Sequence, residues 1–410
     1  MKILGINISH DASVAGIVDG EVKFVYDEAR FRRDKYWAPD YGGSESCMYD
    51  CIEHKLNTEE WDAVIFASFD RRNMKFGISQ EQLVFDRVGA SMFLQEIVKK
   101  PLSHSRMKEL QETFRDGNGK PLISWTEHDL TNDTAVINDI MQHQFRGREG
   151  TEFFNRDFHH LYHAYCGYKL SPFYKDGEDA ICIVQDGGGG QPHYDEYAGF
   201  QEIESIYTCT PTKLAKLQWQ RLSNHRLIND LSNCFPNDYD DCTWCVEDFE
   251  ERLVDNATGD EADFVFTSLP SNGMNFSNMS SAFGTDAEGR AAGKVMGMAS
   301  YGRVRKNVFN MYTVAQQLEI ESFESTCKII DNAIERNPEC KNIVLSGGYS
   351  LNCTNNYKYL EAYPDYQFFV DPVPHDGGTG VGAALWLDEK IKEGEITVEV
   401  DNGTSNEQSD

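Results

Sequence analysis

The chain has 410 residues, of which 40% are hydrophobic and 12% aromatic, so it can bury a sizeable core in two domains or one bilobed unit. Its net charge of -29 disfavours extended binding to nucleic-acid backbones, because an acidic surface repels phosphates. No apolar run reaches the roughly 20 residues that span a bilayer, and the first residues turn polar too early for a signal peptide. Eleven cysteines without framework spacing are typical of reduced thiols, so we expect a soluble, cytoplasmic protein without a membrane partner.

The first 26 residues predict three strands joined by two turns. Apolar runs cover residues 2–8 and 12–18, and residues 21–26 alternate between apolar and polar types. The Asp-Gly pair at 19–20 is the strongest short signal for a tight hairpin. The polar turn at residues 9–11 is similar in place to the turn that faces a nucleotide or acyl phosphate at the start of sugar-kinase, actin and heat-shock-chaperone domains.

A dense charge cluster follows at residues 27–35. It includes Arg30 and Arg33 and carries four basic residues in an otherwise acidic chain. A solvated helix or loop is the ordinary interpretation, but the cluster is also the best candidate for a local anion-binding patch. Beyond it, residues 81–100 have helical periodicity, and residues 133–143 predict a shorter helical stretch.

His159 and His163 have the spacing of a metal-ligand pair. Residues four apart lie one above the other on one face of a helix, so both imidazoles can reach one ion. Ser171-Pro172 then predicts the end of this helix. A histidine cluster satisfied within the core is the alternative, and the glycine-rich loops nearby favour the metal site. His160 is expected elsewhere on the helix, in a supporting or structural role.

Residues 179–210 repeat the opening plan of the chain. A strand at 180–184 runs into the glycine loop 186–190, and further strands are expected at 197–203 and 205–209. The repeated pattern predicts an internal duplication, with two related halves around a cleft.

The polar and aromatic stretch at 211–275 is expected to be an insertion in the second half. It either shapes an acceptor pocket or forms an acidic surface excursion. Its Cys242-Thr243-Trp244-Cys245 motif is a weak zinc or redox signal, because no second pair accompanies it.

Three glycine elements occupy the last part of the chain. They are Gly293-Lys294-Val295-Met296-Gly297 with the residues up to 302, Ser346-Gly347-Gly348 with Asn352 after a strand at 342–345, and Asp376-Gly377-Gly378 before a helix at 381–387. Glycines between a strand and a helix let backbone N–H groups approach a phosphate. Each loop alone is a common packing device, but several in one chain, most of them at predicted strand ends, indicate one cleft.

These motifs occur in one order over residues 1–387. They are His10-Asp11-Ala12-Ser13, the charge cluster at residues 27–35, His159-His160 with His163-Ala164, Ser171-Pro172-Phe173, Asp186-Gly187, Gly293-Lys294 with Met296-Gly297, Ser346-Gly347-Gly348 with Leu351-Asn352, and Asp376-Gly377-Gly378. In this order they resemble the O-carbamoyltransferase family, which includes nodulation-factor and antibiotic-tailoring enzymes. Single motifs are common, but the ordered set is specific.

The resemblance implies an α/β protein with a duplicated actin-like fold of the ASKHA type, related to the threonylcarbamoyl-tRNA transferase. The first half would cover residues 1–178 with the metal-binding helix, the second 179–390, and a disordered acidic tail 391–410. A divalent transition metal, iron in that family, would be held by His159, His163 and Asp376. The residues expected at the nucleotide and donor are Arg30, Arg33, Asp186, Gly187, Gly188, Ser346, Gly347, Gly348 and Asn352.

Moving a carbamoyl group to an alcohol sets the chemistry that these residues must supply. A metal on two histidines and one carboxylate, with open positions, can polarise the carbonyl as a Lewis acid. His10 titrates in the range of a general base and is expected to remove the alcohol proton, with Asp11 orienting its imidazole. Lys294 and the two arginines would neutralise the leaving phosphate.

The chain departs from the family in length. Members usually continue into a second domain that makes carbamoyl adenylate from carbamoyl phosphate and ATP, and 410 residues are too few to include it. Either a separate protein supplies the activated group, or the chain uses carbamoyl phosphate more directly, or the natural chain has been shortened. The donor is therefore expected to be carbamoyl phosphate, or carbamoyl adenylate made with ATP.

Two other classes of function stay open. A sugar- or acetate-type kinase of the same fold would hold magnesium on carboxylates, which the histidine pair disfavours. A non-catalytic nucleotide- or metal-binding partner subunit is the other, and the joint presence of His10, both helix histidines and Asp376 favours an enzyme instead. The acceptor is expected to be a sugar-like hydroxyl or, since the acidic composition is typical of marine phage proteins, a hydroxymethyl pyrimidine such as 5-hydroxymethylcytosine in a nucleotide or DNA of a host cytoplasm.

Overall fold

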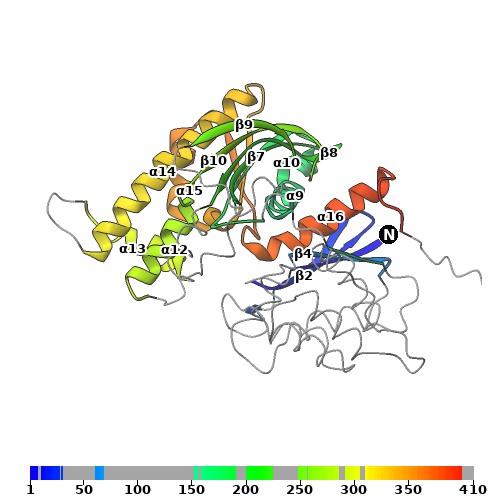
Figure 1. Ribbon diagram of the computed structural model, residues 1–410, viewed down its shortest axis with the longest axis horizontal. Coiled ribbons are helices and arrows are strands. Elements are labelled where there is room, and N and C mark those ends of the chain that lie inside the picture. Colours follow the sequence, from blue (N-terminus) through cyan, green and yellow to red (C-terminus); the bar gives the residue numbers. More distant parts are fainter. Residues whose placement is uncertain are drawn as a thin grey trace, which may run out of the picture. The chain divides into compact units, whose positions relative to one another are not determined.

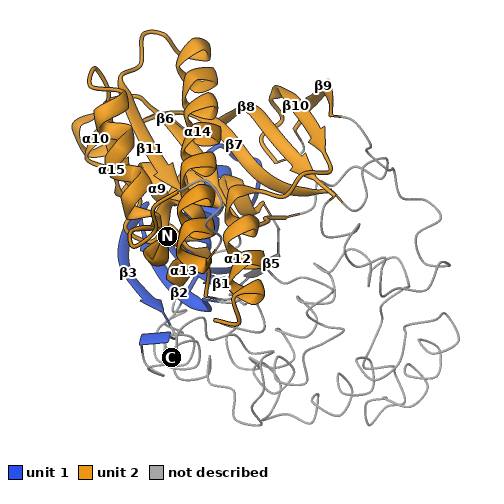
Figure 2. Ribbon diagram, turned by 90° about the vertical axis from the view of Figure 1, so that its left-hand side faces the viewer, with its two compact units in different colours: residues 1–157, 379–410 blue, residues 158–378 orange. Residues whose placement is uncertain are grey.

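The computed structural model describes residues 1–7, 11–27, 29–30, 61–68, 152–155, 158–190, 200–224, 248–255, 257–285, 291–304 and 310–398. The chain forms two compact units, one of residues 1–157 with 379–410 and one of residues 158–378 (Figure 2). The helical stretches expected at 81–100 and 133–143 and the Cys242-Cys245 motif lie outside the described residues. None of the helices described is both long and apolar enough to cross a bilayer.

The first unit contains a five-stranded sheet in the order β3-β2-β1-β4-β5. Its strands are β1 (Lys2–Asn7), β2 (Ser13–Val18), β3 (Glu21–Asp27), β4 (Ala63–Ser68) and β5 (Glu152–Asn155). Helix α16 (Thr379–Lys392) packs against β1, β2 and β4 of this sheet (Figure 1). The approach is close, because a Cβ atom on Gly5 would lie only 1.8 Å from the carbonyl oxygen of Gly380. Glycine is therefore required at this contact.

The predicted hairpin between β2 and β3 is confirmed. Asp19 and Gly20 have φ angles of 52° and 80°, as a two-residue turn of type I′ needs at both central positions. β1 and β2 pair antiparallel, as do β2 and β3, whereas β4 runs parallel to β1. The three strands expected in the first 26 residues are therefore all present.

The second unit contains a seven-stranded sheet in the order β12-β11-β6-β7-β8-β10-β9. Its strands are β6 (Ala180–Gln185), β7 (Gln201–Thr210), β8 (Lys213–Ser223), β9 (Phe249–Val254), β10 (Glu261–Thr267), β11 (Asn342–Ser346) and β12 (Gln367–Val370). β6, β7 and β8 form an antiparallel meander, and β11 and β12 continue the sheet in parallel beside β6. This is the arrangement of β1, β2, β3, β4 and β5 in the first sheet. The duplicated α/β fold of the ASKHA type is thus confirmed.

Two expectations about the second sheet were wrong. The segments 197–203 and 205–209 are not two strands, because residues 201–210 form the single strand β7. The third strand of the meander is β8, so the stretch 211–275 is not an insertion throughout. Within it, β10 pairs parallel with β8, and β9 pairs antiparallel with β10, which extends the repeated sheet by two strands.

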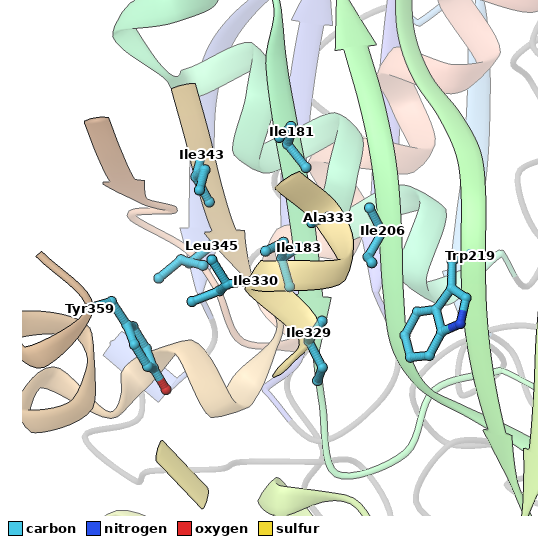
Figure 3. Packing of buried hydrophobic residues seen from close by; sticks show 10 residues of the cluster. All are labelled: Ile181, Ile183, Ile206, Trp219, Ile329, Ile330, Ala333, Ile343, Leu345 and Tyr359. Carbon is cyan, nitrogen blue, oxygen red and sulfur yellow. The ribbon is translucent and has the colours of Figure 1, made fainter. Parts of the chain in front are cut away.

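Helices cover both faces of the second sheet. On one face lies α9 (His159–Leu170), where a Cβ on Gly167 would contact the side chains of Val344 and Ser346. The alternate residues of β11, Ile343 and Leu345, face α14 (Met311–Arg336) and α15 (Cys353–Ala362) on the other. Figure 3 shows this core, whose members are Ile181, Ile183, Ile206, Trp219, Ile329, Ile330, Ala333, Ile343, Leu345 and Tyr359. The sheet is therefore the middle of three layers.

The compact units do not coincide with the expected halves 1–178 and 179–390. Helix α9 packs against β6, β7, β8 and β11, which places it with the second unit, while α16 packs with the first. Helix α16 also continues to Lys392, past the expected start of the tail at residue 391. Residues 399–410 lie outside the described residues.

Candidate metal centre

Helix α9 begins at His159 and carries both predicted histidine ligands on one face. It ends at Leu170, before the predicted Ser171-Pro172 boundary, where α10 (Pro172–Asp176) begins with the Ser171 hydroxyl accepting from the backbone N–H of Tyr174. The Nε2 atoms of His159 and His163 lie 3.2 Å apart, and both side chains are buried. The spacing of four residues therefore places the two imidazoles side by side on one face of the helix, as the sequence predicts.

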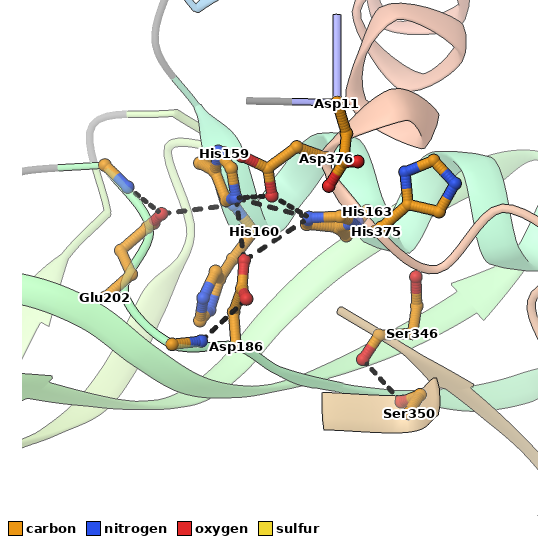
Figure 4. A network of polar contacts seen from close by, with 12 residues as sticks. Asp11, His159, His160, His163, Asp186, Glu202, Ser346, Ser350, His375 and Asp376 are labelled. Atoms are coloured by element: carbon orange, nitrogen blue, oxygen red, sulfur yellow. Dashed lines mark hydrogen bonds and ion pairs between the residues drawn. The ribbon is translucent and has the colours of Figure 1, made fainter. Parts of the chain in front are cut away.

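Two aspartates approach the histidine pair from loops that follow strands. Asp186 comes directly after β6, and its Oδ2 atom lies 2.9 Å from Nε2 of His159 and 3.7 Å from Nε2 of His163. Asp376 begins the short helix η4 (Asp376–Gly378), and its Oδ1 atom lies 3.5 Å and 4.0 Å from the same two nitrogens. Figure 4 shows the two imidazoles and two carboxylates turned toward one another.

The four side chains match the requirements of a divalent transition metal. Each offers one ligand atom, all four atoms lie within 4.8 Å of one another, and only Asp186 is as much as 9% exposed. Imidazole nitrogen together with carboxylate oxygen is a donor set for iron, zinc and similar ions. The sequence placed Asp186 among the residues expected at the nucleotide and donor, whereas its carboxylate here faces the histidines and completes a group of four.

The charges of the group are mutually stabilising. Burial alone lowers the pKa of His159, but the charge of Asp376 and the hydrogen bond to Asp186 raise that pKa well above its ordinary value. Burial alone raises the pKa of Asp186, and the hydrogen bonds from His159 and His163 reverse this and hold the pKa well below its usual range. The two carboxylates thus favour positive charge on His159.

His160 has a different environment from its neighbours. Its Nδ1 atom lies 2.7 Å from the hydroxyl oxygen of Ser205, and its ring is fully buried. Burial, with the nearby charge of His159, lowers the pKa of His160 well below its ordinary value. It is not one of the four candidate ligands, and its supporting or structural role stays a prediction.

Two of the predicted glycine loops lie side by side in the second unit. β6 and β11 are parallel neighbours, so the loops that follow them leave the same edge of the sheet. A Cβ on Gly348 would lie 2.9 Å from Oδ1 of Asp186, and one on Gly347 would lie 2.2 Å from the carbonyl oxygen of Gln185. Gly187 donates its backbone N–H to Oδ1 of Asp186 at 2.6 Å. Asp186 therefore belongs to both the metal group and the glycine loops.

The other predicted site residues have separate places. Asn352 is buried, caps α15 by accepting from the N–H of Asn355 and donates to Glu319, so its role in the structure is that of a cap. Lys294 is exposed on helix α13 (Ala292–Ala299), and the segment 293–302 is mainly helix and not a strand-end loop. Arg30 is exposed, and Asp11 is buried with a φ angle of 62°. His10 and Arg33 lie outside the described residues.

A model of the N-terminal part of carbamoyltransferases, described as "Carbamoyltransferase N-terminus", matches residues 2–326. The chain belongs to the carbamoyltransferase family. This confirms the resemblance drawn from the ordered motifs. No curated protein matches the chain.

The solved structures similar to this carbamoyltransferase-family chain share little sequence identity with it. Full-length HypF in its phosphate- and nucleotide-bound form has a TM-score of 0.44 and 11% identity, covering 95% of this chain and 56% of its own. HypF from T. kodakarensis has a TM-score of 0.43 and 14% identity, with coverages of 97% and 48%. The activator of 2-hydroxyisocaproyl-CoA dehydratase from Clostridium difficile has a TM-score of 0.39, 9% identity and coverages of 97% and 98%. The chain thus spans about half the length of the two HypF chains.

Proposed function

We propose that this chain carries the transfer site of an O-carbamoyltransferase. The observation that supports this most directly is the buried group of His159, His163, Asp186 and Asp376 in a chain of the carbamoyltransferase family. These four side chains would hold one divalent transition metal, iron by resemblance to the family. Such an ion supplies Lewis acidity that polarises a carbonyl oxygen.

The glycine loops give the donor a place beside this group. Gly187 and Gly188 follow Asp186 in the chain, Gly348 lies against its carboxylate, and Gly347 lies against Gln185. The backbone of these four glycines is the candidate for contact with the phosphate of carbamoyl phosphate or carbamoyl adenylate. In this proposal they bind and orient the donor, while Arg30, Arg33 and Lys294 are candidates for neutralising the leaving phosphate. ATP is needed only if carbamoyl adenylate is the donor.

The reaction moves one carbamoyl group between two oxygen atoms. The acceptor hydroxyl oxygen forms a bond to the carbamoyl carbon, and the bond from that carbon to the phosphate oxygen breaks, so the phosphate or adenylate leaves with the electron pair. The hydroxyl proton passes to a general base, for which His10 is the candidate, with Asp11 orienting its imidazole. The acceptor is an alcohol, either a sugar-like small molecule or a hydroxymethyl pyrimidine in a nucleotide or DNA.

The decisive experiment follows the carbamoyl group itself. Purified protein is incubated with ¹³C-carbamoyl phosphate, with and without ATP, and with a panel of hydroxylated acceptors, and products are detected by mass. We expect the mass of one carbamoyl group to be added to one acceptor class, and this product to disappear after chelation of the metal. Phosphoryl gain on the acceptor from ATP would instead identify a kinase. Absence of any transfer, even with a carbamoyl-adenylate-forming protein added, would contradict the proposal.

A further inference from the structure

Helix α9 begins at a candidate metal ligand and has no side-chain cap of its own. Its N-cap residue is Phe158, which cannot accept a hydrogen bond through its side chain, and no acidic residue stands in its first turn. The first N–H groups of a helix need partners from outside it. One of them, the N–H of His160, donates to Oε2 of Glu202 on β7 at 3.1 Å. The negative charge at this end of the helix is also favourable for the helix dipole.

The same carboxylate holds the loop that carries Asp186. Oε2 of Glu202 also accepts from the N–H of Gly190 at 3.2 Å, at the far end of the loop 186–190. The backbone of Glu202 bonds this loop twice more, since Gly189 donates to its carbonyl oxygen at 2.7 Å and its own N–H donates to the carbonyl of Gly190 at 3.0 Å. One residue therefore joins the loop to the start of α9.

The other carboxylate oxygen is fixed from the sheet. Oε1 of Glu202 accepts from Nε2 of Gln220 on β8 at 3.0 Å, and that amide group also donates to the Ser205 hydroxyl oxygen at 3.0 Å. Both oxygens of Glu202 thus have partners on elements other than its own strand. Figure 4 shows Glu202 beside His160, next to the metal group.

The packing leaves little freedom between the loop and the histidines. A Cβ on Gly189 would lie 2.8 Å from Cδ2 of His160, 2.9 Å from Oε2 of Glu202 and 3.1 Å from Cδ2 of His159. The loop backbone therefore rests directly on the two rings. A small movement of the loop would change the distance between Asp186 and His159, which is 2.9 Å between ligand atoms.

We propose that Glu202 is a positioning residue for the metal centre, whose carboxylate joins the loop 186–190 to the first turn of α9 and so keeps Asp186 at ligand distance from His159 and His163. This inference rests on the proposed metal site. Glu202 itself does not bind the metal and acts through the N–H groups of His160 and Gly190. Substitution of a residue that holds metal ligands in place commonly weakens metal affinity 10- to 100-fold.

The test uses Co²⁺ as the probe in the full chain. Its affinity is measured by competition with a chelator, its ligand field by visible absorption, and the stability of the metal-free protein by thermal unfolding. For Glu202→Ala we expect affinity about 10- to 100-fold weaker and an altered cobalt spectrum. Glu202→Gln keeps one acceptor oxygen and should lose less cobalt affinity.

The control is Asp255→Ala, since Asp255 is also a turn-stabilising carboxylate but accepts from Thr258 between β9 and β10. It should lower the melting temperature and leave cobalt affinity unchanged.

The outcomes separate this inference from the metal site on which it rests. If the wild-type protein binds no Co²⁺, the metal centre itself is contradicted. If the wild type binds but a folded Glu202 variant has wild-type affinity and spectrum, only the positioning role is overturned. The role is likewise overturned if both Glu202 variants fail to fold, because the carboxylate is then a requirement of the fold. Weaker cobalt binding in Asp255→Ala to the same degree would also overturn it.

Discussion

Asp186 lies between the proposed metal group and the glycine loop proposed for the donor, which the sequence assigned to different residues. Its Oδ2 atom faces the histidine pair, while its Oδ1 atom accepts from the N–H of Gly187 in the glycine loop. A carboxylate with one oxygen toward the proposed metal and the other toward the loop proposed to bind the donor would keep the two in a fixed relation. This residue therefore decides between a three-residue and a four-residue metal centre.

We expect Asp186→Ala to lose metal to the same extent as Asp376→Ala, with affinity weakened at least about tenfold. The physical reason is that its Oδ2 atom is the carboxylate oxygen nearest to both histidines. Elemental analysis of purified variants measures this. Asp331→Ala, which removes an exposed carboxylate on α14, is the control and should keep its metal. Full metal content in Asp186→Ala would return this residue to the nucleotide or donor contact expected from sequence.

The protonation of His159 makes the stability of the metal-free protein depend on pH. The folded pKa is raised above the unfolded value of about 6.5, so the charged form stabilises the fold fully below that value. The contribution is lost as the pH rises through the raised folded value. The melting temperature of metal-free protein should therefore fall as the pH rises above about 6.5, and His159→Asn should flatten this fall. Metal affinity should rise over the same range, because metals need neutral imidazole. A flat profile in the metal-free wild type would show that His159 is not charged there.

At the scale of elements, the loop after β11 needs glycine for two reasons. Gly347 has φ and ψ of 85° and 157°, a conformation open almost only to glycine, and a Cβ there would lie 2.2 Å from the carbonyl oxygen of Gln185. Gly347→Ala should therefore lower stability by about 1–3 kcal/mol or more and displace the loop from Asp186. Denaturant unfolding measures the first effect, and metal affinity the second.

Gly297→Ala is the matched control for that substitution. Gly297 lies within helix α13, is exposed and has nothing within 4 Å of its would-be Cβ. Alanine there should stabilise the helix by up to about 1 kcal/mol. Equal destabilisation by both substitutions would mean that the protein responds to any added methyl group, and that the special backbone at Gly347 is not the cause.

The elements with strong local signals were predictable from sequence, and those set by long-range pairing were not. The turn at Asp19-Gly20 and helix α9 have dipeptide and boundary signals, and both are confirmed. β7 was divided because Glu202 and Glu204 interrupt its apolar pattern. In the structure the register with β8 shifts between them, Glu202 bonds α9, and Glu204 pairs with Arg221 at 3.2 Å. The contact of Asp186 with His159 was not predicted, because it depends on a helix 27 residues earlier in the chain.

At the scale of the whole molecule, all four candidate metal ligands found among the described residues belong to one compact unit. The four side chains lie between residues 159 and 376, inside the unit of residues 158–378. A fragment of residues 158–378 should therefore fold and bind one transition metal with an affinity within about tenfold of the full chain. Circular dichroism and chelator competition measure this, and the Asp376→Ala fragment is the control. A folded fragment without metal affinity would show that residues of the first unit are needed at the site.

The strand β9 gives the enlarged second sheet a particular kind of border. Within the described residues it is the last strand beyond β10, and Glu250, Glu251 and Arg252 occupy its middle, largely exposed to solvent. Unpaired strand edges invite pairing with another chain, and charged side chains make such pairing unfavourable. β10 and β9 thus end the repeated sheet in an edge strand whose charged side chains disfavour aggregation. Without these two strands, β8 would be the edge strand.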